Sequence, residues 1–340
     1  MKNYVRLGHH IPQRIVIFRA LQLGDLLCAV PAFRALRAAL PDAEITLVSL
    51  PWARNFVDRF DVYLDDFLEF PGFPGFPEQR SHVHRLPQFL SEVQWLSYDL
   101  ALQMQGSGGI ANSLIELFGA RLTAGFYLPG QYCPDENLFL EYPEGEPEIL
   151  RHLRLMEFLG FPLQGDTLEF PLSERDWMDF DALREQYGLQ MGRYACVHPG
   201  SRSVDRRWPP DRFAAIAEGL VERGFQVVLT GTQDEAQITR AVAALSRAPL
   251  IDLAGKTSLG AVGALVSGAG LVVCNDTGIS HLAAALCTPS VVLFSSSDPQ
   301  RWAPLNRRMH RVVEDATRLT PEGVLVEVDE LLAIGYFYAR

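Results

Sequence analysis

Residues 271–294 read LVVCNDTGISHLAAALCTPSVVLF, and this stretch decides the fold class. Its apolar run at 271–274 predicts a buried strand, the small residues at 281–286 predict a short helix, and 291–294 predict a second strand. A strand, a helix and a strand joined by short turns form a βαβ unit, whose strands lie parallel in a sheet covered by helices. We therefore expect an α/β protein.

The same alternation continues toward the amino terminus. In the second half of the chain, strands are predicted at 194–197 and 225–230, and helices at 210–223, 234–246 and 258–267. In the first half, strands are predicted at 14–18, 44–50 and 100–104, and a helix at 26–40. Each half therefore resembles a doubly wound α/β domain.

The predicted boundary lies between Phe161 and Ser173, a segment with two Phe-Pro steps and no periodicity. We expect a first domain at 1–165 and a second at 166–318. The tail at 319–340 is predicted to form a last helix, because Thr320 suits the N-cap position and Pro321 the first helical position.

Composition limits the class of protein. Thirty basic and 41 acidic residues give a net charge of −11, which argues against a general nucleic-acid binder. The five cysteines form no CxxC pair, so neither a disulfide framework nor a zinc ribbon is indicated, and no metal site is expected. The first residues lack the apolar stretch of a signal peptide, and no apolar run is long enough to span a membrane. We expect a cytoplasmic protein.

Leu23, Gly24 and Asp25 lie between the first predicted strand and the first predicted helix. Ligands of open α/β sheets bind at the carboxyl ends of strands, so Asp25 is placed where it could act as a general base. Aspartate is also a preferred N-cap residue. The pattern therefore leaves open a purely capping role for Asp25.

Gly200 and Ser201 form a turn after the strand at 194–197, and arginines at 202, 206 and 207 follow. Backbone N–H groups in such a turn can bind an anion, and arginine adds bidentate contacts to phosphate oxygens. A solvated basic loop is the alternative interpretation. Because the chain as a whole is negatively charged, a cluster of arginines at this turn favours the ligand-binding interpretation over the solvated loop.

Two further strand-to-helix turns carry candidate residues. Either Asp234 or Glu235 could bind ribose hydroxyls, or these carboxylates could merely sit favourably at a helix N-terminus. Asp276, Thr277 and Gly278 precede the short helix, where N–H groups and the helix dipole favour a pyrophosphate. His281 lies in the first turn of that helix, although a lone histidine is more often structural than catalytic.

Three stretches in order resemble glycosyltransferase family 9, the ADP-heptose:lipopolysaccharide heptosyltransferase family. They are RIVIFRALQLGDLLCAVPAFRALRAALPDAEI at 14–45, HPGSRSVDRRWPPDRFAAIAEGLVERGFQVVLTGTQDE at 198–235, and DLAGKTSLGAVGALVSGAGLVVCNDTGISHLAAALCTPSVVLF at 252–294. The resemblance implies a GT-B architecture, with two Rossmann-like doubly wound domains that face a central cleft. It implies that the tail helix returns to the N-terminal domain.

The resemblance also implies the reaction. An inverting glycosyltransferase without a metal or cofactor would move a heptose or related sugar from an ADP-sugar donor. The acceptor would be a saccharide or lipid-linked saccharide in cell-envelope glycan synthesis, with no nucleic-acid partner. A lipid-linked acceptor leaves open a peripheral contact with the inner face of the cytoplasmic membrane.

Residue roles carried over from the family divide between the two domains. Asp25 would be the catalytic base, with Gly24 on the acceptor side. The donor-binding residues would be Gly200, Ser201, Arg206, Glu235, Asp276, Thr277, Gly278 and His281. Ser201 and Arg206 would contact the phosphates, with Arg206 standing where relatives often have lysine. Glu235 would lie near the nucleoside.

Two alternatives from other functional classes stay open. The chain could be a non-catalytic nucleotide-sugar-binding protein, or a GT-B nucleotide-sugar epimerase. Separately, the predicted surface loop beginning FPGFPGFP at residue 70 could touch lipid through Phe70, Phe73 and Phe76, or those rings could pack onto the protein.

Overall fold

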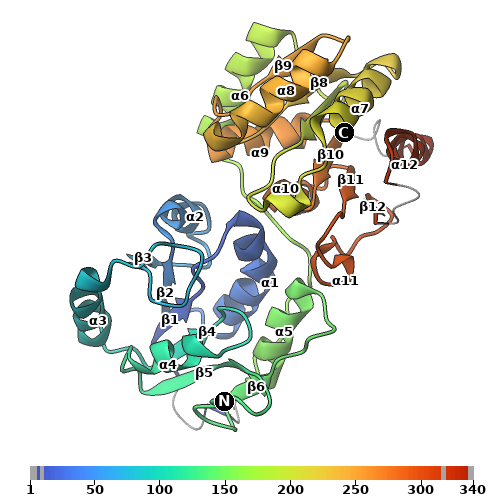
Figure 1. Cartoon of the computed structure of the whole chain (residues 1–340). Coiled ribbons are helices and arrows are strands. Elements are labelled where there is room, and N and C mark those ends of the chain that lie inside the picture. The colour runs from blue at the N-terminus through green and yellow to red at the C-terminus, as the bar shows by residue number, and fades with distance from the viewer. Residues whose placement is uncertain (1–5, 8–10, 315–318, 336–340) are drawn as a thin grey trace. The chain divides into compact units, whose positions relative to one another are not determined.

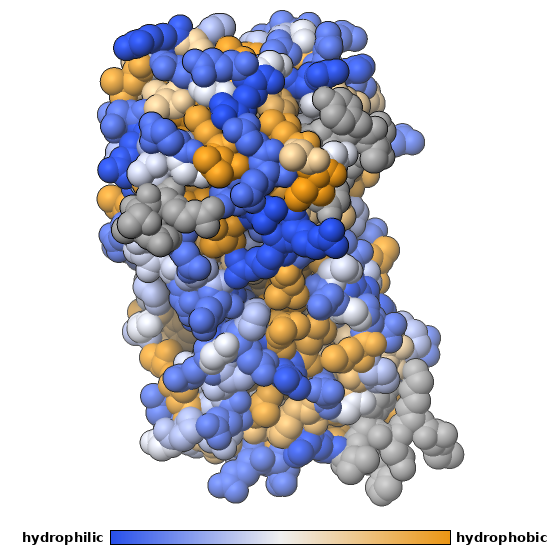
Figure 2. All heavy atoms as spheres, turned by 90° about the vertical axis from the view of Figure 1, so that its right-hand side faces the viewer, coloured by the Kyte–Doolittle hydropathy of each residue, from blue (hydrophilic) through white to orange (hydrophobic). Residues whose placement is uncertain are grey.

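The computed structural model describes residues 6–7, 11–314 and 319–335, and the chain forms two compact units, Met1–Thr167 and Leu168–Arg340. The division lies two residues after the expected boundary at 165. No helix in the described part of the chain is long and apolar enough to cross a membrane. Figure 2 shows hydrophilic and hydrophobic side chains interspersed over one face of the molecule.

The first unit is built on a six-stranded sheet with the order β3-β2-β1-β4-β5-β6 (Figure 1). Its strands are β1 (Arg14–Phe18), β2 (Glu44–Ser49), β3 (Asp66–Glu69), β4 (Leu100–Gln103), β5 (Leu122–Tyr127) and β6 (Phe139–Glu141). The strand pairs are parallel, with Ile15 opposite Ile45 on one side and Leu100 on the other. A parallel sheet needs cover on both faces, which explains why Ile15 through Phe18 are apolar and buried.

The helices of the first unit are α1 (Leu23–Ala39), α2 (Arg54–Arg59), α3 (Leu86–Trp95), α4 (Ile110–Glu116) and α5 (Glu148–Phe158), with short 3₁₀ turns η1 (Pro51–Ala53) and η2 (Val83–Arg85). Helices α1 and α5 pack against each other. Helix α1 begins three residues before the predicted start at Leu26, a difference that bears on the role of Asp25.

The second unit repeats the architecture, with the strand order β12-β11-β10-β7-β8-β9. Its strands are β7 (Tyr194–His198), β8 (Gln226–Leu229), β9 (Leu250–Asp252), β10 (Leu271–Asn275), β11 (Ser290–Leu293) and β12 (His310–Val313). Its helices are α6 (Glu174–Tyr187), α7 (Pro210–Glu222), α8 (Ala236–Leu245), α9 (Leu259–Gly268), α10 (Gly278–Ala285), α11 (Pro299–Trp302) and α12 (Pro321–Ala333), with 3₁₀ turns η3 (Val204–Arg206) and η4 (Gln233–Glu235). The predicted βαβ unit at 271–294 is confirmed as β10, α10 and β11, with Val273 opposite Val291 in parallel register.

Helix α12 packs on the second unit; the family resemblance led us to expect that the tail helix returns to the first unit. Thr320 caps it as predicted, accepting a hydrogen bond from Gly323 N at 3.1 Å. The helix packs against α7, and its apolar residues Val324, Val328 and Leu331 belong to the core of the second unit. Arg223 adds a bidentate ion pair to Asp329, with N–O distances of 2.6 and 2.7 Å. Burial of this apolar side fixes the helix where it lies.

The phenylalanine loop packs onto the first unit. Phe70 is buried, with its ring centroid 5.0 Å from that of Phe18 and 5.7 Å from that of Phe76. Phe73 and Phe76 are half-buried and contact each other edge to face at 6.2 Å. Of the two interpretations left open by the sequence, packing onto the protein is therefore the one that the structure shows.

Two buried histidines make the folded state sensitive to acid. Burial lowers the pKa of His152 on α5 to about 4, and the nearby charge of Arg19 acts in the same direction. Burial likewise lowers the pKa of His310 on β12 to about 4, with His281 adding to the effect. An unfolded chain binds these protons near pH 6.5. Between about pH 6.5 and 4 the unfolded state therefore holds more protons, and stability decreases as the pH falls.

We expect the Tm of the wild-type chain to fall more steeply between pH 6.5 and 4 than that of a His310→Gln variant. One such imidazole contributes on the order of 3 kcal/mol across this window, since one pKa unit corresponds to about 1.4 kcal/mol. His310 Nδ1 lies 2.9 Å from Ser290 Oγ, and glutamine can keep a hydrogen bond there. Thermal unfolding of both proteins across the window checks this. Parallel Tm curves would contradict it.

Candidate functional site

Four segments of the second unit come together at the carboxyl ends of its central strands. They are the Gly200–Ser201 turn after β7, the 3₁₀ turn η3, the turn leading from β8 into η4, and the loop between β10 and α10. Strands β10, β7 and β8 are neighbours in the sheet, so their carboxyl ends meet at one edge. This edge is where ligands bind in open α/β sheets.

Asn275, the fully buried last residue of β10, ties these segments together. Its Nδ2 donates to the carbonyl oxygens of Pro199 at 2.9 Å and Gly200 at 3.3 Å. Its Oδ1 accepts from the backbone N–H of Trp208 at 3.3 Å. The side chain therefore holds the Gly-Ser turn and the segment after η3 against β10. The sequence alone assigned no role to Asn275.

Arg206 and Asp276 form an ion pair across 70 residues of sequence. Arg206 Nη1 lies 3.2 Å from Asp276 Oδ2. The carboxylate is buried, whereas a third of the arginine side chain is exposed. Among the described residues, Asp276 is the one hydrogen-bond or ion-pair partner of the guanidinium, so Nε and Nη2 can donate to a ligand.

The loop after β10 leads into α10 with an extended Thr277 at the N-cap position. Ser280 donates twice to the Thr277 carbonyl oxygen, from its backbone N–H at 2.9 Å and from its hydroxyl at 2.8 Å. Asp276, Thr277 and Gly278 therefore lie at a helix start, as predicted. His281 is buried one turn in, with its ring 6.3 Å from that of Trp302 on α11.

Glu235 lies beside the Gly-Ser turn, with its carboxylate against Gly200. Its Oε2 accepts hydrogen bonds from Thr232 N at 2.8 Å and Thr232 Oγ1 at 3.0 Å. The carboxylate packs so closely on Gly200 that a Cβ at that position would collide with it. Glycine is therefore required here for close approach. Ser201 is also buried, and its carbonyl oxygen accepts from Arg207 Nε at 2.7 Å, so Arg207 holds the turn.

His198 is a member of this cluster that sequence reasoning left without a role. Its Nδ1 lies 3.0 Å from Thr230 Oγ1 and its Nε2 lies 3.7 Å from Glu235 Oε2. Burial lowers the pKa of His198, and the Glu235 carboxylate opposes that shift. Its position at the end of a strand was the one signal in the sequence that pointed toward the site.

Asp25 belongs to the first unit and follows β1, a central strand of that sheet. Because α1 begins at Leu23, the N-cap is Gln22, and Asp25 is the third helical residue. Its Oδ2 accepts from the backbone N–H of Gln22 at 3.2 Å. Asp25 is therefore not the N-cap residue, and that interpretation is wrong. Its carboxylate still stabilises the start of the helix from the third helical position. Gly24 is buried in the same turn.

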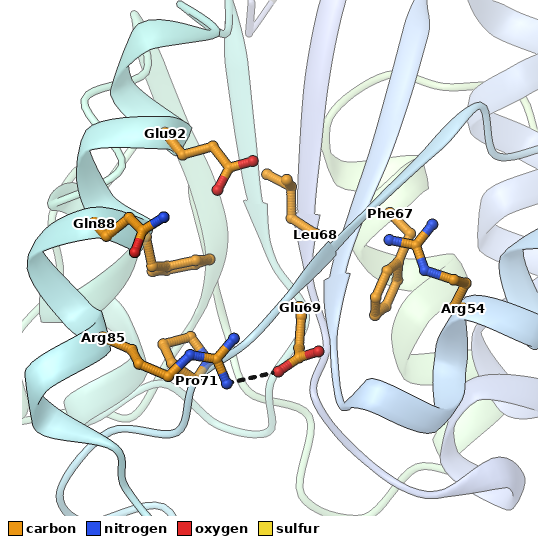
Figure 3. Close-up of a pocket in the computed structure, with 9 residues that line it drawn as sticks. Arg54, Phe67, Leu68, Glu69, Pro71, Arg85, Gln88 and Glu92 are labelled. Atoms are coloured by element: carbon orange, nitrogen blue, oxygen red, sulfur yellow. Dashed lines mark hydrogen bonds and ion pairs between the residues drawn. The ribbon is translucent and has the colours of Figure 1, made fainter.

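A separate pocket of about 220 Å³ lies at the edge of the first sheet, between β3, α2 and α3 (Figure 3). Arg85 on one wall pairs with Glu69 at 2.8 Å, and the Arg54 guanidinium lies 4.9 Å from the centre of the Phe67 ring. None of the predicted site residues lines this pocket. Within the described residues, no group of three or more histidine, cysteine or acidic side chains is arranged to hold a metal ion.

Comparisons with known proteins agree with this architecture. The family model of glycosyltransferase family 9 (heptosyltransferase) matches residues 83–324. Lipopolysaccharide heptosyltransferase 3 of Escherichia coli K12 is 25% identical over 291 residues, covering 83% of this chain and 82% of the relative. Lipooligosaccharide heptosyltransferase 2 of Haemophilus ducreyi is 30% identical over 355 residues, covering 94% and 99%. The structure of E. coli ADP-heptose lps heptosyltransferase II superimposes with a TM-score of 0.74 at 24% identity, covering 94% of this chain and 99% of that one.

Two Rossmann-like units, each with a parallel six-stranded sheet, form the GT-B fold. The chain belongs to glycosyltransferase family 9, the heptosyltransferases, and is an enzyme of glycosyl transfer.

Proposed function

We propose that this chain transfers heptose, or a related sugar, from an ADP-sugar to a saccharide acceptor of the lipopolysaccharide type. The observation that carries the proposal is the cluster in which Asn275 holds the Gly-Ser turn beside the Arg206–Asp276 pair. The names of the relatives, lipopolysaccharide and lipooligosaccharide heptosyltransferases, support the donor sugar and the acceptor class. Such an acceptor would place the enzyme in the cytoplasm, at the inner face of the cytoplasmic membrane.

The donor would bind to the second unit. Ser201, Arg206 and the backbone N–H groups around Thr277 and Gly278 would bind the two phosphates, since a guanidinium and a helix start both favour an anion. Glu235 would accept hydrogen bonds from ribose hydroxyls. Asp276 would aim the guanidinium of Arg206, and His281 would border the transferred sugar.

The first unit would supply the base. Asp25 would take the proton from the acceptor hydroxyl as that oxygen attacks the anomeric carbon of the donor. The bond between the anomeric carbon and the phosphate oxygen would break, and ADP would leave with the electron pair. Attack opposite the leaving group inverts the configuration. Arg206 and the N–H donors would stabilise the charge that grows on ADP, without a metal or cofactor.

Calorimetric titration with ADP, UDP, GDP and CDP in excess EDTA tests the donor assignment. We expect selective ADP binding, weakened at least about tenfold (about 1.4 kcal/mol) in Asp276→Ala, because the Arg206 guanidinium loses the buried carboxylate that orients it. Asp211→Ala, an exposed aspartate in α7, is the matched control and should bind ADP as the wild-type chain does.

Preference for another nucleotide would discard the ADP-sugar donor. An ADP affinity that stays the same or rises in Asp276→Ala would contradict the role given to the Arg206–Asp276 pair.

A further inference from the structure

A cluster of four charged or titratable side chains is buried in the first unit, where α5 packs on α1. Arg19 follows β1, and Glu148, Arg151 and His152 lie on the first turns of α5; their exposed fractions are 0 to 3%. Buried charges persist in proteins only when they are paired and hydrogen-bonded. Each of these groups therefore has to be explained by the partners that it meets.

The partners of Arg19 lead directly to Asp25. Arg19 Nε and Nη2 both donate to the backbone carbonyl oxygen of Asp25, at 3.0 and 2.8 Å. Nη1 donates to the carbonyl oxygen of Met104, which follows β4, at 2.5 Å. The guanidinium therefore links the first turn of α1 to the neighbouring central strand of the sheet.

Glu148 holds this guanidinium in place. Its Oε1 lies 3.1 Å from Arg19 Nη2, and its Oε2 accepts from Arg151 Nη1 at 2.9 Å. Arg151 is in turn held by the carbonyl oxygens of Pro143 and Glu144 and by the Tyr142 hydroxyl. Glu148 is thus the acid shared by two buried arginines, one of which contacts Asp25 and one of which does not.

We propose that Arg19 is a positioning residue for glycosyl transfer: held by Glu148, it fixes the first turn of α1 and with it the carboxylate of Asp25. The inference rests on the proposed role of Asp25 as the general base. Asp25 is the third residue of α1, so the two hydrogen bonds from Arg19 to its carbonyl oxygen act on the turn that carries its carboxylate. A planar guanidinium with several fixed donors can hold such a turn against both β4 and α5, which a lysine ammonium cannot do.

Arg19→Lys and Arg151→Lys form a matched pair for the test. Both replace a fully buried arginine of the same cluster, both lose bonds to two backbone carbonyl groups, and both leave a cation beside Glu148. We expect Arg19→Lys to lower kcat by about 10- to 100-fold with ADP affinity unchanged, since small displacements of a catalytic group have effects of that size. Arg151→Lys should lower the Tm comparably and leave kcat close to that of the wild-type chain.

A double-mutant cycle with Asp25→Asn separates this inference from the proposed function. If Arg19 acts through Asp25, Arg19→Lys should have little further effect on kcat once Asp25 is asparagine. The inference would be overturned if the fold-reductions in kcat of the two single variants multiplied fully in the double variant. It would also be overturned if Arg19→Lys folded and kept the wild-type kcat while Asp25→Asn was impaired. Wild-type activity in Asp25→Asn would instead overturn the proposed base, and the inference with it.

If Arg19→Lys does not fold, Glu148→Gln takes its place in the cycle. Glutamine keeps the size of the side chain and one oxygen, but it loses the charge that holds Arg19. We expect a smaller loss of kcat, again without effect in the Asp25→Asn background. An undiminished kcat would overturn the inference.

Discussion

Replacement of Asp25 by asparagine is expected to lower kcat by about 10²- to 10⁴-fold, the usual effect of removing a general base. Asparagine has the size of aspartate, and its Oδ1 can still accept from the backbone N–H of Gln22, so the start of α1 should persist. ADP binding should be unchanged because the proposed donor-binding residues lie on the second unit. Steady-state transfer rates and ADP titration check the two parts of this expectation.

Asp176→Asn is a matched control for Asp25→Asn. Asp176 occupies the same third position of a helix in α6, and its Oδ2 accepts from Ser173 N at 2.8 Å. The two substitutions should weaken the two helix starts to a similar degree. Only Asp25→Asn should lose activity, and equal rates in the two variants would show that the carboxylate of Asp25 is structural.

Replacement of Arg206 by glutamine is expected to lower kcat/KM by about 10²- to 10³-fold, the effect of removing one strong donor to a developing negative charge. The loss should appear in kcat as well as in donor KM, because the charge on ADP grows in the transition state. Arg206→Lys keeps the cation and should recover most of the rate. Steady-state kinetics with varied donor measure both parameters.

Two outcomes would contradict this role of Arg206. One is a change in KM alone, which would indicate ground-state binding without preferential stabilisation of the leaving group. The other is Arg206→Lys being as impaired as Arg206→Gln, which would show that the geometry of the pair with Asp276 matters more than the charge at the phosphates.

The elements that could be predicted from sequence are those with a strong local pattern. The unit at 271–294 has apolar β-branched strands around small helical residues, and it was found in parallel register with its predicted order. The turn residues Gly200, Arg206, Glu235 and Asp276 all follow strands that proved to be neighbours in one sheet. Topology alone therefore brought them to one edge.

What could not be predicted depends on long-range packing. The buried side chain of Asn275 joins segments 67 to 76 residues apart. The sequence places Arg19 after a strand but does not indicate its partner, because Glu148 lies 129 residues further along the chain. The start of α1 was missed because Gln22 is a weaker capping signal than Asp25. The expectation that the tail helix returns to the first unit came from the family resemblance, because nothing in the pattern of the helix indicates which core it covers.

Acceptor-dependent transfer from ADP-heptose in excess EDTA is the reaction that the proposed function requires. The purified chain, the donor and a lipopolysaccharide-core saccharide acceptor would be incubated together, with ADP release and the anomeric configuration of the product followed by NMR. We predict ADP release that requires the acceptor, a product with inverted configuration, and loss of both signals in Asp25→Asn. Conversion of free nucleotide sugars without acceptor, or donor binding with no transfer to any core saccharide, would contradict the account.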